Sequence, residues 1–243
     1  MKKAILLFSM PFLFFMTLPA QVTSAEADSI VIERMSGEIK PYTIYAYYSK
    51  WAYYLPPESK IITATGDTIE LDYPCWVYYV DFANETTAKY LFVKESSGNI
   101  LELNVINEEV PAYLRWRWRI VATYPLTPFE NFSLGGPCQW TLPYNWLGNV
   151  IINSEKEFEN YMVCHEGTSG IDFSQHTLLL VQNGAAYGIV LIEKYFQQIS
   201  NTEYNFYVNV TTGDAPVAEY FLESVLVPKL PQNATVNFII NRH

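Results

Sequence analysis

Short segments in which apolar and polar residues alternate recur through residues 26–121. A period of two is typical of strands that bury one face, and these segments are rich in Val, Ile, Thr, Tyr and Trp, which favour strands. Gly66-Asp67 and Ser96–Asn99 each separate two such segments, so each is expected to form the turn of a hairpin. No amphipathic helix is evident in this part of the sequence. The pattern therefore predicts a small β-barrel or β-sandwich.

The alternation stops in residues 122–148, where prolines and glycines are frequent. These are Pro125, Pro128, Gly135, Gly136, Pro137 and Pro143. Regular elements tolerate such residues poorly in their interiors, so the segment is expected to be a linker between two domains. It also holds aromatic residues such as Trp140, which predict that it packs against the rest of the protein.

A helix signature opens residues 149–243. Ser154 is expected to be the N-cap, and Glu157 follows at the spacing of a capping box. Three apolar residues then occur at helical spacing: Phe158, Tyr161 and Met162. Alternating segments typical of strands resume after them. Residues 149–243 are thus expected to form a compact α+β domain with one short helix, and the whole chain to be mainly β.

The N-terminus has the features of a secretory signal peptide. Lys2 and Lys3 precede an almost wholly apolar run over residues 4–18, and small residues follow. Cleavage is expected after Ala20 or after Ala25, so residues 1–25 are assigned to the signal. The apolar run is shorter than the roughly 20 residues that a spanning helix needs. We therefore expect an exported protein of the periplasm or cell surface that does not span the membrane after cleavage.

The charge of the chain argues against one class of partner. Its formal net charge is −10, with 25 acidic and 15 basic residues. An acidic surface repels the phosphate backbone, so no nucleic-acid partner is expected.

Three cysteines occur, at positions 75, 138 and 164. Export implies an oxidising compartment, in which disulfides persist. Cys75 lies within a strand-like run and is expected to be a small buried apolar residue. Cys138 and Cys164 lie in irregular sequence and are predicted to form a disulfide, which leaves one free thiol.

An arginine-rich strand is the most unusual stretch of the sequence. In residues 114–120, Arg115, Arg117 and Arg119 alternate with apolar residues, and these are three of only five arginines in the chain. Alternation places the guanidinium groups on one face. That face could bind an anionic ligand or an acidic partner, because Arg recognises carboxylates in bidentate fashion. The more ordinary interpretation is that it pairs with carboxylates of the same chain.

Aromatic residues crowd the stretch from Tyr42 to Tyr79, including Tyr45, Tyr47, Trp51 and Tyr53. If they were exposed together, these rings could stack on sugars. The alternative is that Tyr and Trp simply favour half-buried pleated surfaces.

Candidate catalytic chemistry is sparse. His176 follows Asp172 and Ser174 closely in sequence, but nearness along the chain is weak support for a catalytic triad. No nucleophile elbow, phosphate-binding loop or dinucleotide-binding glycine pattern occurs. Cys138, Cys164 and His165 could ligate zinc, although export favours the disulfide. We therefore expect no catalytic residues, no metal and no cofactor.

The order of motifs in the C-terminal part resembles a known family. A Ser154–Phe158 helix start is followed by Ile171–Ser174, then Asn183–Ile189 and finally Val227–Leu230. Over about residues 149–243, this resembles the C-terminal domain of the protease-complex subunit PrcB and similar domains of exported Bacteroidetes proteins. The family has Thr-Gly-Gly-Tyr where this chain has Ala-Ala-Tyr-Gly, at residues 185–188. The resemblance implies a non-enzymatic domain that contacts a protease or another envelope protein.

These features lead to a ranked expectation of function. The first hypothesis is a non-catalytic interaction module that binds an envelope protein, with its oligomeric state left open. The second is a carbohydrate-binding protein that uses the aromatic-rich face and has a glycan as its partner. The third is a hydrolase whose polar residues converge only in the folded chain.

Overall fold

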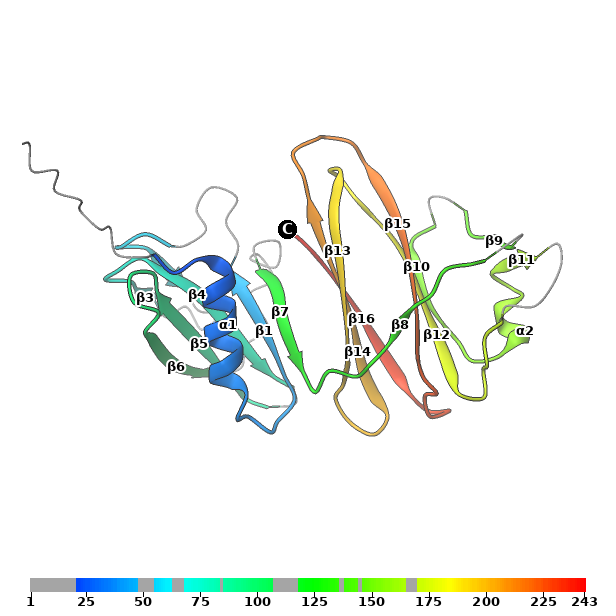
Figure 1. The fold of residues 1–243 in the computed structure, drawn as a ribbon, viewed down its shortest axis with the longest axis horizontal. Coiled ribbons are helices and arrows are strands. Elements are labelled where there is room, and N and C mark those ends of the chain that lie inside the picture. Colours follow the sequence, from blue (N-terminus) through cyan, green and yellow to red (C-terminus); the bar gives the residue numbers. More distant parts are fainter. Residues whose placement is uncertain are drawn as a thin grey trace, which may run out of the picture.

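Most of the chain is built from strands, as the sequence predicts. The structure is a computed structural model, and it describes residues 21–47, 55–62, 68–83, 85–106, 118–135, 138–143, 146–164 and 170–243. Figure 1 shows its layers in order: helix α1 (Ser24–Met35), an N-terminal sheet, a two-sheet sandwich, and helix α2 (Glu155–Phe158) at the far end.

Five strands form the N-terminal sheet, in the order β6-β5-β4-β1-β7. They are β1 (Tyr42–Tyr47), β4 (Cys75–Phe82), β5 (Thr87–Lys94), β6 (Ile100–Ile106) and β7 (Trp118–Tyr124), and every neighbouring pair is antiparallel. Both predicted hairpins pair as expected: β5 with β6, and β2 (Lys60–Ile62) with β3 (Thr68–Glu70). The sheet is open, with β6 and β7 as its edges, so the closed barrel offered as one alternative is wrong.

Helix α1 is an element that the alternation did not predict. Thr23 is its N-cap: the Glu26 backbone N–H donates to the Thr23 hydroxyl, and the Glu26 carboxylate accepts from the Thr23 backbone N–H in return. Ala27, Val31 and Met35 are four residues apart, so they form one buried stripe along the helix. This stripe packs on the N-terminal sheet, which makes the second layer of this half a helix and not a second sheet.

Both faces of the N-terminal sheet are covered over its central strands, and this explains why β1, β4 and β5 are buried along most of their length. One face carries Ile44, Tyr78 and Leu91 against α1. The other carries Tyr79, Tyr90 and Trp118, which pack together with the β2–β3 hairpin and with side chains of the C-terminal half. A sheet that is buried on both faces loses the simple contrast between an apolar and a polar side.

The C-terminal half is a sandwich of two sheets. One sheet has the order β10-β12-β15-β8, and the other has the order β13-β14-β16. The bounds are β8 Glu130–Asn131, β10 Gly148–Ile152, β12 His176–Ala185, β13 Ile189–Gln198, β14 Glu203–Thr212, β15 Glu219–Pro228 and β16 Thr235–Arg242. Strands β14 and β16 are parallel, and the other pairs are antiparallel. The core between the sheets includes Leu179, Phe196, Phe206 and Val225, all of which are fully buried.

Residues 122–148, which the prolines and glycines predicted to be a linker, contribute to three sheets instead. Strand β7 continues to Tyr124, β8 joins the edge of the sandwich at β15, and β9 (Cys138–Trp140) pairs with β11 (Met162–Cys164). Trp140 packs edge-on against Phe158 in a separate apolar cluster beside α2, as its aromatic character predicted. Strands of two or three residues are too short to show a period, so the alternation could not reveal them.

The predicted start of α2 is confirmed, but the helix is shorter than its apolar spacing indicated. The Glu157 backbone N–H donates to the Ser154 hydroxyl at 3.2 Å, and the Glu157 carboxylate accepts from the backbone N–H of Asn153. The helix ends at Phe158, so Tyr161 and Met162 lie beyond it. All three apolar side chains still enter the same cluster, because the chain turns directly into β11.

A buried polar network joins the two halves. The side-chain amide of Gln197, on β13, donates to the backbone carbonyls of Tyr42 and Tyr124 at 3.0 and 2.6 Å. Its carbonyl oxygen accepts from the hydroxyls of Tyr207 and Thr43 at 3.1 and 3.3 Å. Because both donors and both acceptor positions of the amide are used, this side chain sets how the sandwich sits on the N-terminal sheet.

Candidate functional site

Of the three arginines predicted to bind a ligand or partner, only Arg119 lies within the described residues. Arg119 lies on β7, while Arg115 and Arg117 lie outside the described residues. Trp118 and Ile120 on either side of it are buried in the opposite face of the sheet, so the predicted alternation is confirmed here. Arg119 points toward α1, on the face that the helix covers.

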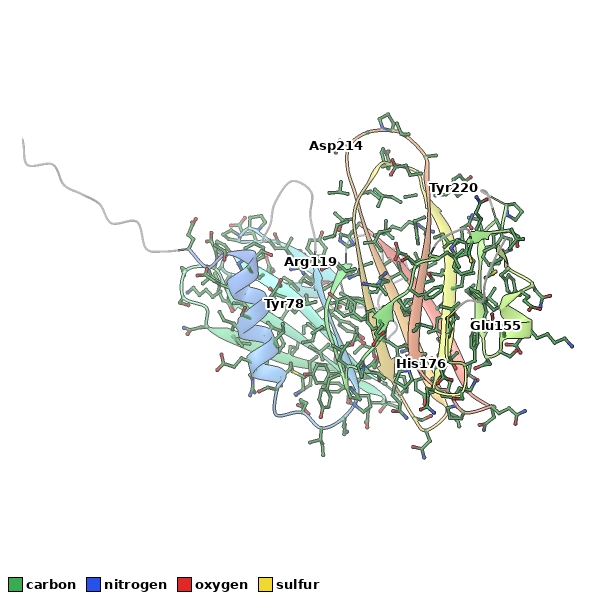
Figure 2. The ribbon with its side chains drawn as sticks, turned by 45° about the vertical axis from the view of Figure 1, so that its right-hand side comes forward. Tyr78, Arg119, Glu155, His176, Asp214 and Tyr220 are labelled. Carbon is green, nitrogen blue, oxygen red and sulfur yellow. The ribbon has the colours of Figure 1, made fainter. Side chains whose placement is uncertain are left out.

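Arg119 and two residues near it form what we call the Asp28 cluster: Asp28, Tyr78 and Arg119. The Arg119 guanidinium contacts the Asp28 carboxylate at 2.5 Å, and it also reaches the Ser24 hydroxyl at 3.4 Å. The second carboxylate oxygen of Asp28 accepts from the Tyr78 hydroxyl at 2.9 Å. Figure 2 shows Tyr78 and Arg119 beside the helix. This guanidinium therefore pairs with a carboxylate of the same chain, as the more ordinary interpretation of the arginines expects.

A cavity of about 280 Å³ adjoins the Asp28 cluster. Its walls come from α1, β1, β4 and β7, and they include Ser24, Tyr47 and Trp76 besides the cluster itself. Burial, with a smaller effect of the Asp28 charge, raises the pKa of Tyr78, so its hydroxyl stays protonated and can donate to Asp28. A neutral phenol and a matched ion pair supply neither a nucleophile nor a base. The cluster is suited to fixing the helix on the sheet.

Burial shifts the pKa of two groups in the C-terminal half, Tyr195 and His243, and the positive charge of Arg119 has a smaller, lowering effect on both. Burial raises the pKa of Tyr195 to about 12, with the Glu193 charge adding to this shift. Burial lowers the pKa of His243 to about 4, and the positive charge of Arg119 lowers it further. His243 is therefore neutral at pH 7, and it forms a 3.0 Å hydrogen bond with the Thr211 hydroxyl through Nε2.

The predicted aromatic face is mostly part of the core where the structure describes it. Tyr45 is buried in the cluster that contains Tyr79 and Trp118, and Tyr47 is half-buried with its ring edge-on to Trp118. Trp51 and Tyr53 lie outside the described residues. Tyr45 thus presents no surface on which a sugar could stack, and of the two described residues only Tyr47 reaches the surface in part.

Asp172, Ser174 and His176 lie together, but they form a turn and not a triad. The Ser174 hydroxyl donates to the Asp172 carboxylate at 2.6 Å, which with the Ser174 backbone N–H lowers the pKa of Asp172. The His176 ring lies 3.3 Å from the Asp172 backbone carbonyl. In a triad, by contrast, the imidazole contacts both the hydroxyl and the carboxylate. These contacts cap the turn that leads into β12.

The prediction for Cys75 is confirmed, whereas Cys138 and Cys164, expected in irregular segments, lie in the short strands β9 and β11. Cys75 is free and buried in β4, and burial raises the pKa of its thiol to about 12, which makes it inert at pH 7. Cys138 and Cys164 are direct partners in the antiparallel pair of β9 and β11.

One surface feature could not be read from the alternation. Five large apolar residues are between 37% and 69% exposed near one end of the sandwich, and we call them the apolar tip: Tyr187, Val190, Leu191, Val217 and Tyr220. The β12–β13 turn and the β14–β15 loop are held together there, because Gly188 donates to the Ala215 carbonyl and accepts from Gly213. Figure 2 shows Asp214 and Tyr220 toward this end, with His176 toward the opposite one.

Searches for similar proteins identify none: no protein-family model, no curated protein and no solved structure matches this chain. The PrcB-like resemblance of the C-terminal part therefore stays a prediction. Within the described residues, no helix is long and apolar enough to cross a membrane. The same residues hold no group of three or more His, Cys, Asp or Glu side chains that could bind a metal ion.

Proposed function

We propose that this protein is an exported, non-catalytic interaction module that binds another protein of the cell envelope through the apolar tip. The observation that carries the proposal is a set of five exposed apolar side chains on two loops and on the strand ends beside them, where hydrogen bonds join the two loops. Monomeric proteins rarely leave such groups in water unless a partner covers them. A rigid backbone also lowers the entropic cost of binding.

Two further features support the same surface. Tyr187 of the apolar tip lies in the Asn183–Ile189 stretch, which carries part of the PrcB-like resemblance and with it an implied contact with an envelope protein. Tyr187 and Tyr220 supply aromatic rings, which are enriched at protein interfaces. Two acidic residues are close to these residues in the chain: Asp214 is exposed, and the Glu219 carboxylate accepts from the Ile189 backbone N–H at 2.6 Å.

Replacing Val190 and Val217 together by Ser should weaken capture of the partner at least tenfold, because the change removes two apolar contacts from the interface. The measurement is affinity capture from solubilised envelope of the host, with recovery of the retained protein quantified by mass spectrometry. Ile39→Ser is the matched control, since Ile39 is 87% exposed on the loop between α1 and β1. Both variants should keep the unfolding free energy within about 0.5 kcal/mol, as exposed sites generally do. Equal recovery with all three proteins would contradict a role for the tip.

Contacts of Val22 and Thr23 distinguish the two candidate cleavage sites of the signal peptide. The Val22 backbone N–H donates to the Glu95 carbonyl at 2.8 Å, and Thr23 caps α1. Cleavage after Ala25 would remove both residues, and loss of a cap alone costs about 1 kcal/mol. Cleavage after Ala20 would keep every one of these contacts. We therefore infer that the mature chain begins at Gln21.

The Cys138–Cys164 disulfide belongs to the same proposal of an oxidising compartment. Residues that face each other in an antiparallel pair have Cα atoms about 4.5–5.5 Å apart. A disulfide requires Cα atoms roughly 4.4–6.8 Å apart, so the register of β9 and β11 suits the bond. The bond would close the loop that contains α2 and stabilise the cluster around Phe158.

The intact mass of the protein isolated from the envelope tests both inferences. We expect the mass of a chain that starts at Gln21, lighter by about two hydrogen atoms than the reduced form. Reduction should restore those hydrogens in the natural protein and change nothing in a Cys164→Ser variant. A chain that starts at Glu26, or a natural protein whose mass does not change on reduction, would show that the corresponding inference is wrong.

A further inference from the structure

Among the described strands, β6 is an edge strand with exposed apolar side chains. It is the outer strand of the N-terminal sheet, and among the described strands it pairs with β5 alone. Figure 1 shows it on the side of the sheet away from β7 and the sandwich. Leu101, Leu103 and Ile106 are 53%, 39% and 66% exposed. An edge of this kind exposes unpaired backbone N–H and C=O groups and acts as a template for another strand.

Within the described residues, β6 lacks several of the features that often protect an edge strand. Its sequence, Ile-Leu-Glu-Leu-Asn-Val-Ile, contains no Lys, Pro or Gly. Its seven pairs with β5 run without a bulge. Its one charge, Glu102, is neutralised by Lys89 at 2.9 Å and by Arg34 at 2.8 Å. Edges that must stay unpaired generally carry at least one such feature, so β6 is built to be paired.

We propose that two copies of this chain pair through β6, antiparallel about a two-fold axis at Leu103, so that their N-terminal sheets become one continuous sheet. A two-fold axis perpendicular to the sheet keeps corresponding faces together, and closed dimers of this symmetry are the commonest oligomers. In the resulting register Leu103 faces its own copy, Leu101 faces Val105, Glu102 faces Asn104, and Ile100 faces Ile106.

The side-chain pattern of β6 is complementary to itself in this register. Every apolar residue faces an apolar residue, on both faces of the sheet. The single charge faces an amide, because Glu102 lies opposite Asn104 of the second copy, whose side-chain N–H can donate to the carboxylate. Directly opposed apolar pairs and charge–amide pairs stabilise a sheet, whereas like charges destabilise it.

The neighbouring two-fold registers are worse. An axis at Glu102 places the two carboxylates directly opposite each other, and it sets Ile100 against Asn104. An axis at Asn104 places Glu102 opposite Ile106, where the carboxylate loses water without gaining a partner. An unrelated strand would need to match this alternation by chance, while a second copy matches it by symmetry.

Cysteine cross-linking tests both the dimer and its register. Leu103→Cys places the two new thiols opposite each other, at a Cα separation of about 4.5–5.5 Å, which suits a disulfide. Leu101→Cys is the matched control, since this residue is more exposed but lies about 13 Å from its own copy in the proposed register. Under mild oxidation of the purified protein at micromolar concentration, we expect a covalent dimer from Leu103→Cys and at least tenfold less from Leu101→Cys.

A second measurement does not depend on cysteine. In sedimentation velocity, the purified protein should form a dimer with a dissociation constant in the micromolar range, as expected for a small interface. Leu103→Lys should weaken the dimer at least a hundredfold, because it places two ammonium groups opposite each other. Leu147→Lys, at a 60% exposed site elsewhere, should leave the dimer unchanged. A monomer at all concentrations, or equal cross-linking of both cysteine variants, would overturn the proposal. Neither result would affect the proposed role of the apolar tip.

Discussion

Replacing Gln197 by Leu should lower the free energy of unfolding by about 3 kcal/mol, since it removes the donor to one buried and one partly buried carbonyl group, and leaving such a group unpaired costs roughly 1–3 kcal/mol. The carbonyls belong to Tyr42 and Tyr124 in the N-terminal half, and Gln197 comes from the C-terminal half. Leucine has a similar volume, so it creates no large cavity, and the loss reflects the missing hydrogen bonds. Urea unfolding, followed by tryptophan fluorescence, measures the effect.

The neighbouring residue supplies the control for this prediction. Gln198 is half-buried, and its side-chain amide donates only to the nearby Ser200 carbonyl at 3.0 Å. Gln198→Leu should therefore change the unfolding free energy by less than about 1 kcal/mol. If Gln197→Leu cost no more than this, the amide network would not hold the two halves together.

The same experiment shows whether the halves unfold together. Tyr207 of β14 packs in one cluster with Trp118 and Ile120 of β7, so the N-terminal sheet and the sandwich share part of their core. We expect a single unfolding transition in the natural protein. Two transitions in the Gln197→Leu variant would show that the shared apolar cluster alone does not keep the halves coupled.

Alternation in the sequence predicted strands and hairpins well, because each depends on neighbouring residues. It assigned Trp118 and Arg119 to opposite faces of one strand, and the structure agrees. It missed α1 because Ile30 and Ile32 flank Val31 of the buried stripe, so the apolar residues do not fall on one helical face. A short stripe of this kind is visible only when the sheet that it covers is known.

The candidate site could not be predicted from the sequence of single strands. Alternation shows which residues share a face, but not whether something covers that face. Tyr45 is buried because it lies on a central strand of a sheet that is covered on both sides, whereas Leu101 is exposed on the edge strand β6. The partner of Arg119 is also remote, since Asp28 lies 91 residues earlier in the chain. Contacts of this range follow from topology and not from local pattern.

Replacing Arg119 by Ala should lower the free energy of unfolding by about 2–4 kcal/mol, because it removes the cationic partner of Asp28, whose side chain is only 18% exposed. Tyr78 alone would then hold this carboxylate. The expected structural consequence is loosening of α1, since Asp28 connects the helix to both β4 and β7. Hydrogen exchange measures this loosening: the α1 backbone amides should exchange faster in the variant than in the natural protein, while the amides of the sheet change little.

Arg34→Ala provides a matched comparison within the same helix. Arg34 also joins α1 to the sheet, through Glu102, but its side chain is 56% exposed and Glu102 keeps Lys89 as a partner. An exposed pair of this kind contributes about 0–1 kcal/mol, so this variant should unfold almost as the natural protein does. A larger loss with Arg34→Ala than with Arg119→Ala would contradict the structural role of the Asp28 cluster. A larger loss of stability with Arg119→Ala than with Arg34→Ala would show that Arg119, a predicted ligand-binding residue, serves mainly to bind Asp28 of its own chain.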